Sequence, residues 1–426
     1  MHIRKCYIAF ALFFAGYQPT LAAEGEEPHQ LELVARNLYW NHHKQGGLDQ
    51  REWGQGLRLD FRSRYTPGTI GIGVELGAYS LLKLQGNATH SGQAGVLVPT
   101  GTGGTKDAAF TGGGAIKLRI ANTELRYGNN LRPYNPVFAV ADTRILPATV
   151  QGWWLQSQDI PNTTLEAGNF IASRDFNSTH FHRQFYASYA GVSTDMAGFI
   201  GGRHTINDAL SVSAYASKFR DIWRQYYGNV NYTIPLPSAQ NLNMDFNIYR
   251  SDSTGKKLAG AIGVTAWSFL TAYNVGAHTF KVSFQKINGA QPFDYLGLGP
   301  GTFHDSIYLA NSSQLSDFNG PGEQSWGVFY SVDMTTYNLP GLSFHARYIR
   351  GSKANGDRLP AHSPYSYYAH GEKHWERDLE LRYVVPSGRA KNLLLRVRYA
   401  THRINGSSDT SSDQLRLIVE YPYNFL

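Results

Sequence analysis

Apolar and polar residues alternate one by one along much of the chain, in stretches of about ten residues, the span of a transmembrane strand. Residues 242–249 set Leu, Met, Phe and Ile against Asn, Asp, Asn and Tyr. Residues 415–425, at the end of the chain, show the same period with several aromatic side chains. A period of two places the apolar set on one face of a β-strand. The pattern therefore predicts strands with one face in an apolar medium and the other in water.

Short turns and long connections alternate between these segments, as in a barrel with short periplasmic turns and long external loops. Residues 66–68, 207–208, 274–276 and 386–388 carry the Pro, Gly, Asn and Asp of tight turns. The longer connections are 79–109, 129–147, 173–196, 288–323 and 352–372. Eighteen strands are expected near residues 30–40, 53–65, 68–79, 110–121, 122–128, 148–156, 162–172, 197–206, 209–219, 222–235, 241–250, 262–274, 276–287, 324–336, 341–351, 373–385, 390–403 and 412–425.

Composition points to a membrane rather than a soluble core. The chain has 27 Tyr, 22 Phe and 8 Trp, but no long uncharged apolar run. Aromatic residues form girdles at both interfaces of outer-membrane barrels. Backbone donors and acceptors inside lipid must be paired, so strands cross a bilayer only as a closed barrel. We expect an all-β protein, a transmembrane antiparallel β-barrel of about 18 strands with long external loops, two of them folding inward.

The N-terminus reads as a secretory signal peptide. Arg4 and Lys5 precede a short apolar stretch, residues 6–16, and the small residues Ala22 and Ala23 follow. We expect residues 1–23 to be this signal peptide and residues 24–426 to be a single barrel domain in the outer membrane of a Gram-negative cell. Cleavage would remove the only cysteine and lower the formal charge from +7 to +5. No run of basic residues predicts a nucleic-acid partner.

A barrel of eighteen strands leaves a water-filled lumen, because only barrels of about eight strands are filled by their own side chains. The inward positions near the end of the chain are basic, and barrel closure brings the first strands beside them. The strand residues expected on this wall are Arg58, Lys117, Arg119, Arg347, Arg382, Arg396, Arg398 and Arg416. Arg36 has a less regular strand around it. A row of cations along the pore predicts passage of carboxylate-bearing solutes. The alternative is that these charges only keep the pore filled with water.

Two of the long loops are expected to fold into the lumen. Residues 129–147 are stiffened by prolines and carry Arg132 and Arg144 as candidate pore charges. Residues 288–323 are rich in aromatic and turn residues, and loops of this length are usually functional or disordered. The alternative for both is a shield of variable external loops. The Gly-, Thr- and Ser-rich connection 79–109 has no role that the sequence identifies.

The remaining motifs carry little chemistry. Gly71, Gly73 and Gly77 imitate a dinucleotide fingerprint with the wrong final spacing and no following helix. His180 and His182 have no third metal ligand at a suitable spacing. No nucleophile elbow or paired-carboxylate arrangement is recognisable. We therefore expect no catalytic residues, metal or cofactor.

Several stretches resemble the OprD-type porins, substrate-specific outer-membrane channels of pseudomonads and their relatives. They run in order through the mature chain at 50–53, 60–61, 65–68, 117–120, 123–125, 242–247, 276–280, 285–289, 292–295, 316–323, 347–350 and 419–422. The stretch Asp-Phe-Asn-Gly-Pro-Gly-Glu, residues 317–323, is the most specific. The resemblance implies a barrel narrowed by its third and seventh loops, with a basic ladder facing an acidic pocket. Asp294, Tyr295 and Asp317 are then the pocket candidates in the long loop.

The resemblance also implies uptake of small carboxylates, either basic amino acids and small peptides or aromatic acids of the benzoate type. The expected partners are these solutes and outer-membrane lipid, with the barrel a monomer or a loose homotrimer. The choice of acid, the oligomeric state and antibiotic permeation stay open. Two other classes of function are considered: an adhesin or receptor that uses the long loops, and a barrel enzyme that hydrolyses lipids or peptides.

Overall fold

The computed structural model describes residues 28–87 and 89–426. The expected signal peptide, residues 1–23, lies outside the described residues. The barrel strands are β1 (Gln30–Lys44), β2 (Gln50–Arg62), β3 (Ile70–Gln85), β4 (Ala108–Ile120), β5 (Thr123–Leu131), β8 (Thr149–Ser157), β9 (Thr163–Arg174), β12 (Ala197–Thr205), β13 (Leu210–Phe219), β14 (Trp223–Leu236), β15 (Gln240–Ser253), β16 (Gly263–Val275), β17 (His278–Asn288), β19 (Gln324–Asp333), β20 (Leu342–Ala354), β21 (Glu372–Val384), β22 (Leu394–Ile404) and β23 (Ser412–Asn424).

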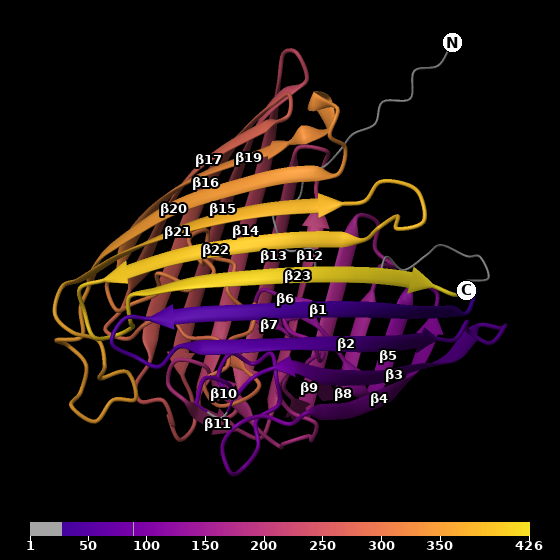
Figure 1. Cartoon of the computed structure of the whole chain (residues 1–426), viewed down its shortest axis with the longest axis horizontal. Helices are drawn as coiled ribbons and strands as arrows, with labels where there is room; N and C mark the ends of the chain where they lie inside the picture. Colours follow the sequence, from indigo (N-terminus) through magenta and orange to yellow (C-terminus); the bar gives the residue numbers. More distant parts are fainter. Residues whose placement is uncertain (1–27, 88) are drawn as a thin grey trace.

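Each of these strands pairs antiparallel with its neighbours in the chain, and β1 pairs with β23 from Glu32↔Asn424 to Lys44↔Ser412. The sheet of 18 strands therefore closes on itself, as Figure 1 shows. Closure leaves no unpaired edge, which is the condition for strands to lie in lipid. The predicted barrel and its strand count are confirmed. Among the described residues, no helix is long and apolar enough to cross a membrane.

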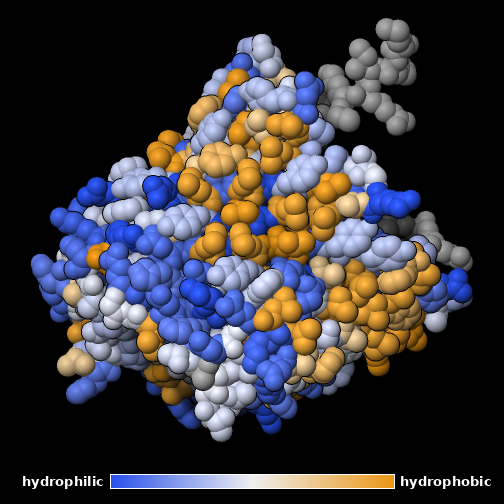
Figure 2. Space-filling model, in the orientation of Figure 1, coloured by the Kyte–Doolittle hydropathy of each residue, from blue (hydrophilic) through white to orange (hydrophobic). Residues whose placement is uncertain are grey.

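Burial follows the alternation in the sequence. On β22, Leu395, Val397 and Tyr399 face outward with 38–42% of their surface exposed, while Arg396 and Arg398 face inward. Apolar side chains cover the middle of the strands in Figure 2, and hydrophilic ones gather at the end that carries the long loops. The outer face thus suits hydrocarbon and the inner face suits water.

The strands differ from the expected ranges mainly at their loop ends. Alternation continues on β3 to Gln85, and β4 begins at Ala108. The connection expected at 79–109 is therefore only 86–107. Five short strands inside the long loops were not predicted: β6 (Tyr134–Asn135), β7 (Phe138–Ala139), β10 (Phe185–Ala187), β11 (Val192–Thr194) and β18 (Leu296–Gly297). The one helical element is a 3-10 turn, η1 (Met334–Tyr337), in the described part of the chain.

Loops fold into the barrel and build an apolar core there. Phe138 of the 132–148 loop packs on Phe170, Phe185 and Phe199, with ring centroids 4.7–6.1 Å apart. The 289–323 loop joins this core through Phe293, which is fully buried. The two loops expected to fold inward do so, and a third loop, 175–196, pairs with the 289–323 loop through β10 and β18.

Glycines on β2 make room for the 132–148 loop. Gly54 and Gly56 face the lumen, and a Cβ at Gly54 would lie 2.7 Å from Ile145 Cδ1. A Cβ at Gly56 would meet Ile145 more closely still. Any larger residue at these two positions would push the loop away from the wall, so these glycines set how deeply the loop enters the pore.

Candidate functional site

One cavity of about 2400 Å³ runs through the barrel. Its lining includes Gln30 and Lys44, the two ends of β1, so the space reaches from the turn end of the barrel to the long-loop end. The loops 132–148 and 289–323 contribute Arg144, Asp305 and Asp317, among others, to the lining. A water-filled passage narrowed by two loops is the arrangement of a selective pore.

Arg58 of β2 fixes the 132–148 loop against the wall. Its guanidinium donates to the carbonyls of Ile145 at 2.7 Å and Arg144 at 2.5 Å, and to Asp142 Oδ1 at 2.5 Å. Only 3% of Arg58 is exposed. Arg36 of β1 faces inward as well and donates to Asp142 Oδ1 at 2.9 Å and to the Arg144 carbonyl at 2.7 Å. Both arginines therefore hold the loop more than they offer free charge to a solute.

Asp142 is the counter-charge of these two arginines. Burial would raise the pKa of its carboxyl, but the guanidinium groups of Arg36 and Arg58 outweigh burial and hold the pKa well below its usual range. The carboxylate stays ionised at any physiological pH. Asp142 was not among the sequence candidates, since nothing in the loop pattern marks it.

Arg144 reaches into the cavity from the same loop. Its Nε donates to the Ala94 carbonyl at 2.9 Å, and its guanidinium lies over the rings of Trp40 and Phe176, 4.3 and 4.9 Å from their centroids. Burial lowers the pKa of Arg144 to about 10, so it remains a cation. Among the described residues it has no carboxylate within ion-pair distance, which leaves its charge available to the pore.

The Ala94 carbonyl is held in place by Glu52 of β2. Glu52 is fully buried, and its two carboxylate oxygens accept the backbone N–H groups of four residues of the 86–107 loop. These are Gly92, Ala94, Val96 and Leu97, at 2.7–3.0 Å. The loop whose role the sequence left open is thus a support for Arg144.

Replacing Glu52 with Gln is expected to loosen this loop. Two of the buried N–H donors would face an amide NH2 instead of an oxygen, and a buried polar group without a partner costs about 1–3 kcal/mol. Trypsin should then cut at Lys106 in the folded barrel, and anion selectivity measured by reversal potential should fall as Arg144 loses its support. The control is Asp107→Asn in the same loop, whose side chain is 91% exposed. Equal protease resistance in both variants would remove Glu52 from this role.

The basic wall is built on β21, β22 and β23. Cross-strand pairing sets Arg382 opposite Arg396 and Arg398 opposite Arg416. Like charges directly opposite each other are destabilising. Glu380 relieves the repulsion, because its carboxylate accepts Arg396 Nε and Nη2 at 2.8 and 2.7 Å and lies 3.0 Å from Arg398 Nε. The row of arginines on this wall therefore contains one carboxylate, that of Glu380, between Arg396 and Arg398.

The arginines at the ends of this row differ in whether a carboxylate neutralises them. Arg347 forms an ion pair with Asp378, which neutralises most of its charge. Arg416 lies over Trp40, 3.8 Å from the ring centroid, and donates to Gln414 Oε1 at 2.6 Å. Arg416 and Arg382 both line the cavity, and neither has a carboxylate within ion-pair distance in the part of the chain that the structure describes. The wall as a whole stays positive.

Three further predicted residues lie nearer the turn end. Arg132 lines the cavity and donates from Nη2 to Asp60 Oδ1 at 3.0 Å. Lys117 and Arg119 of β4 face inward but lie outside this cavity. The Lys117 ammonium and the Arg119 guanidinium both contact the ring of Tyr65, each 4.3 Å from its centroid. Both cations pack on Tyr65 of the β2–β3 turn and do not line the main passage.

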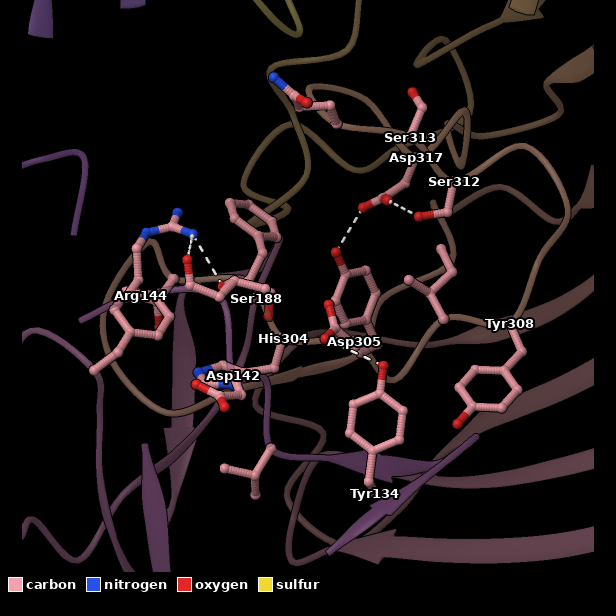
Figure 3. Close-up of a pocket in the computed structure, with 18 of the residues that line it drawn as sticks. Tyr134, Asp142, Arg144, Ser188, His304, Asp305, Tyr308, Ser312, Ser313 and Asp317 are labelled. Carbon is pink, nitrogen blue, oxygen red and sulfur yellow. Dashed lines mark hydrogen bonds between the residues drawn. The ribbon is translucent and has the colours of Figure 1, made fainter. Parts of the chain in front are cut away.

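Acidic and phenolic groups of the 289–323 loop line the side of the cavity that lies away from Arg144, as Figure 3 shows. Asp305 accepts the Tyr134 hydroxyl at 3.2 Å, and burial raises the pKa of Asp305. Asp317 accepts the hydroxyls of Tyr189, Tyr295 and Ser312 at 2.6–2.7 Å. Tyr295 and Asp317 were candidates from the sequence, whereas Asp305 was not. The site therefore offers cations on one side and carboxylates on the other.

Asp294 lies behind this lining rather than in it. Its carboxylate accepts the backbone N–H groups of Tyr189, Ala190 and Tyr295 at 2.7–2.9 Å and the Tyr365 hydroxyl at 3.0 Å. Burial raises its pKa to about 6, although these donors oppose the rise. These four donors occupy the carboxylate oxygens, so Asp294 has little hydrogen-bonding capacity left for a solute. Its hydrogen bonds connect three external loops instead.

The wall across from the arginines is made of amides. Asn229 and Asn231 of β14 each donate to Asp245 Oδ1 at 2.9 Å, and Asn243 donates to Asn231 at 2.8 Å. Ser211, Ser213 and Ser331 also line the cavity. Asp333 does not, because it caps η1 at the turn end.

The family follows from comparison with known proteins. Residues 26–425 match the family described as outer membrane porin, OprD family. The chain belongs to the OprD family of outer membrane porins. It is 44% identical to Porin D of Pseudomonas aeruginosa, over 94% of this chain and 92% of that protein.

Solved structures agree with this assignment. The structure of Pseudomonas aeruginosa OprD is similar with a TM-score of 0.83 and 42% identity, covering 95% of this chain and 98% of that one. Pseudomonas aeruginosa OpdK with vanillate has a TM-score of 0.83 at 28% identity, covering 93% and 99%. The porin is therefore an outer-membrane channel of the Gram-negative type, and these relatives are channels rather than enzymes.

Sequence reasoning missed three of the carboxylates that shape the site, namely Glu380, Asp142 and Asp305. Glu380 was visible, because it occupies an inward position of the β21 alternation. Asp142 and Asp305 lie in irregular loops, where no period assigns a side chain to a face. Only their folded contacts reveal them.

Proposed function

We propose that the porin mediates passive, substrate-selective uptake of small solutes that carry both a carboxylate and an ammonium group, namely amino acids and small peptides. The carboxylate moves along the basic ladder of Arg416, Arg398, Arg396 and Arg382 after meeting Arg144. The ammonium group is held at the same time near Asp305 and Asp317. The observation that carries the proposal is one cavity lined by cations on one side and by loop carboxylates on the other.

The chemistry of the two sides supports this division of roles. A guanidinium group binds a carboxylate with two parallel hydrogen bonds, and several weak sites in series let a solute leave again. Asp317 already accepts three hydroxyls, so it contributes charge more than empty hydrogen-bonding positions. The 44% identity to Porin D is consistent with a substrate-specific channel.

A second candidate is an aromatic acid. OpdK, a relative at 28% identity, has been crystallised with vanillate. Tyr134, Tyr308 and Phe303 supply aromatic surface to the cavity here. An aromatic monocarboxylate would use the ladder and these rings, but it would gain nothing from Asp305 and Asp317.

A double substitution distinguishes the two. Asp305→Asn with Asp317→Asn is expected to slow liposome uptake of arginine and lysine about fivefold to tenfold, equal to about 1–1.4 kcal/mol. Benzoate uptake should stay equal or rise, since two repelling charges are gone. Asp208→Asn with Asp333→Asn, both in turns outside the cavity, removes the same charge and serves as control. Unchanged uptake of arginine and lysine, together with faster uptake of benzoate, would favour the aromatic acid as substrate.

A further inference from the structure

Five cations gather on the outer surface at the long-loop ends of neighbouring strands. They are Lys286 on β17, Arg350 and Lys353 on β20, and Lys373 and Arg377 on β21, and we call them the basic patch. All but Lys286 are exposed. Arg377 alternates with the buried, inward-facing Glu376 and Asp378, so it points away from the lumen. The patch therefore faces the membrane rather than the transported solute.

Strand register surrounds the patch with aromatic rings. Arg350 pairs directly with Trp326 on one side and Trp375 on the other. Arg377 pairs with Tyr348, whose ring lies 5.8 Å from those of Trp326 and Trp375. Paired residues in an antiparallel sheet point to the same face. These outward aromatics mark the level of the lipid headgroups, and they place the patch at the boundary of the outer leaflet.

The patch lacks counter-charges of its own. Among the described residues, none of its five members has a carboxylate within the 4.0 Å of an ion pair, and Lys286 donates to the Gly322 carbonyl at 3.0 Å. Arg403 on the next strand differs, because Asp413 lies 2.7 Å from its guanidinium. The lumen differs too, since Glu380 separates its arginines. Cations that repel one another without an internal anion favour an external one.

We infer that the basic patch binds the phosphate groups of a phosphorylated glycolipid of the outer leaflet. Guanidinium groups form paired hydrogen bonds with phosphate oxygens and stack on aromatic rings, and both elements are present around Arg350 and Arg377. The acyl chains lie along the apolar outward residues below, which include Val328, Leu379 and Leu381. Basic clusters at the membrane surface recognise anionic headgroups in the same way. This inference is independent of the proposed solute.

The test compares two double variants of equal charge change. Arg350→Gln with Arg377→Gln removes the two patch arginines that pair with aromatic residues. Arg389→Gln with Lys391→Gln removes two exposed cations from the β21–β22 turn at the other end of the barrel. The whole mature porin in neutral detergent is titrated with bisphosphorylated lipid A, with dephosphorylated lipid A of the same acyl chains, and with inorganic phosphate. Bound lipid is counted by native mass spectrometry, and affinity is measured by calorimetry.

We expect the wild type and the turn variant to bind bisphosphorylated lipid A at least tenfold more tightly than the dephosphorylated lipid. The patch variant should lose at least tenfold in affinity for the phosphorylated lipid, with unchanged single-channel conductance as evidence of folding. Arg350→Lys with Arg377→Lys keeps the charge but not the paired hydrogen bonds, and should lose only severalfold. Equal lipid A affinity in wild type and patch variant would overturn the inference. Displacement of the lipid by an equimolar amount of inorganic phosphate would overturn it as well, since it would indicate a site for free phosphate.

Discussion

Arg58→Ala should widen the pore and weaken its selectivity. The substitution removes three hydrogen bonds that hold residues 142–145 against β2 and leaves Asp142 with one arginine fewer. The side chain of Arg58 is buried but that of Asp142 is 47% exposed, so the expected cost is that of the lost hydrogen bonds, about 0.5–1.5 kcal/mol each. The backbone hydrogen bonds between the barrel strands stay intact, so the substitution destabilises the position of the 132–148 loop and not the barrel. We expect single-channel conductance in planar bilayers to rise severalfold, with uptake of larger neutral sugars that the wild type retards.

Two matched variants separate this effect from a general loss of charge. Arg51→Ala lies on the same strand with an exposed side chain and should leave conductance unchanged. Arg58→Lys keeps a cation near Asp142, but a single ammonium cannot reproduce the guanidinium fork to both carbonyls, so its conductance should be intermediate. A wild-type conductance in Arg58→Ala would mean that Arg36 and the loop packing hold the loop without Arg58.

Arg398→Ala should interrupt the basic ladder. Glu380 now lies between Arg396 and Arg398, and in the variant its carboxylate would pair with Arg396 alone. The file would then have a neutral gap between Arg382 and Arg416. Carboxylate uptake into liposomes should fall about tenfold, a loss of about 1.4 kcal/mol. The reversal potential under a salt gradient should shift toward cations, and neutral sugars should pass as before.

The salt dependence and the reciprocal variant sharpen this test. The difference from wild type should shrink at 1 M salt, where the Debye length is about 3 Å. Glu380→Gln should act in the opposite direction and make the pore more anion-selective, because it frees both arginines. If Arg398→Ala and Glu380→Gln both keep the wild-type ion preference and carboxylate flux, the arginines only keep the wall wet and the ladder mechanism fails.

The barrel itself could be predicted from the sequence. All eighteen expected segments are strands. A segment of ten residues with alternating polarity can lie in lipid only as a strand of a closed barrel, because its backbone groups must be paired there. The same period assigned Arg382, Arg396 and Arg398 to the inner face, and they line the cavity. Strand ends were less well determined. β3 runs six residues beyond its expected end, since the period extends past the membrane into the rim.

The loops carry no such period, and the tertiary structure decided what they contribute. Tyr295 and Asp317 reach the cavity, whereas Asp294 in the same loop is turned to three backbone N–H groups. Lys117 and Arg119 have the inward phase of the ladder, yet they pack on Tyr65 and do not line the cavity. Alternation fixes the face of a strand on which a side chain lies. It does not fix which distant loop residue comes to rest against that side chain, because those contacts depend on how the whole chain packs inside the closed barrel.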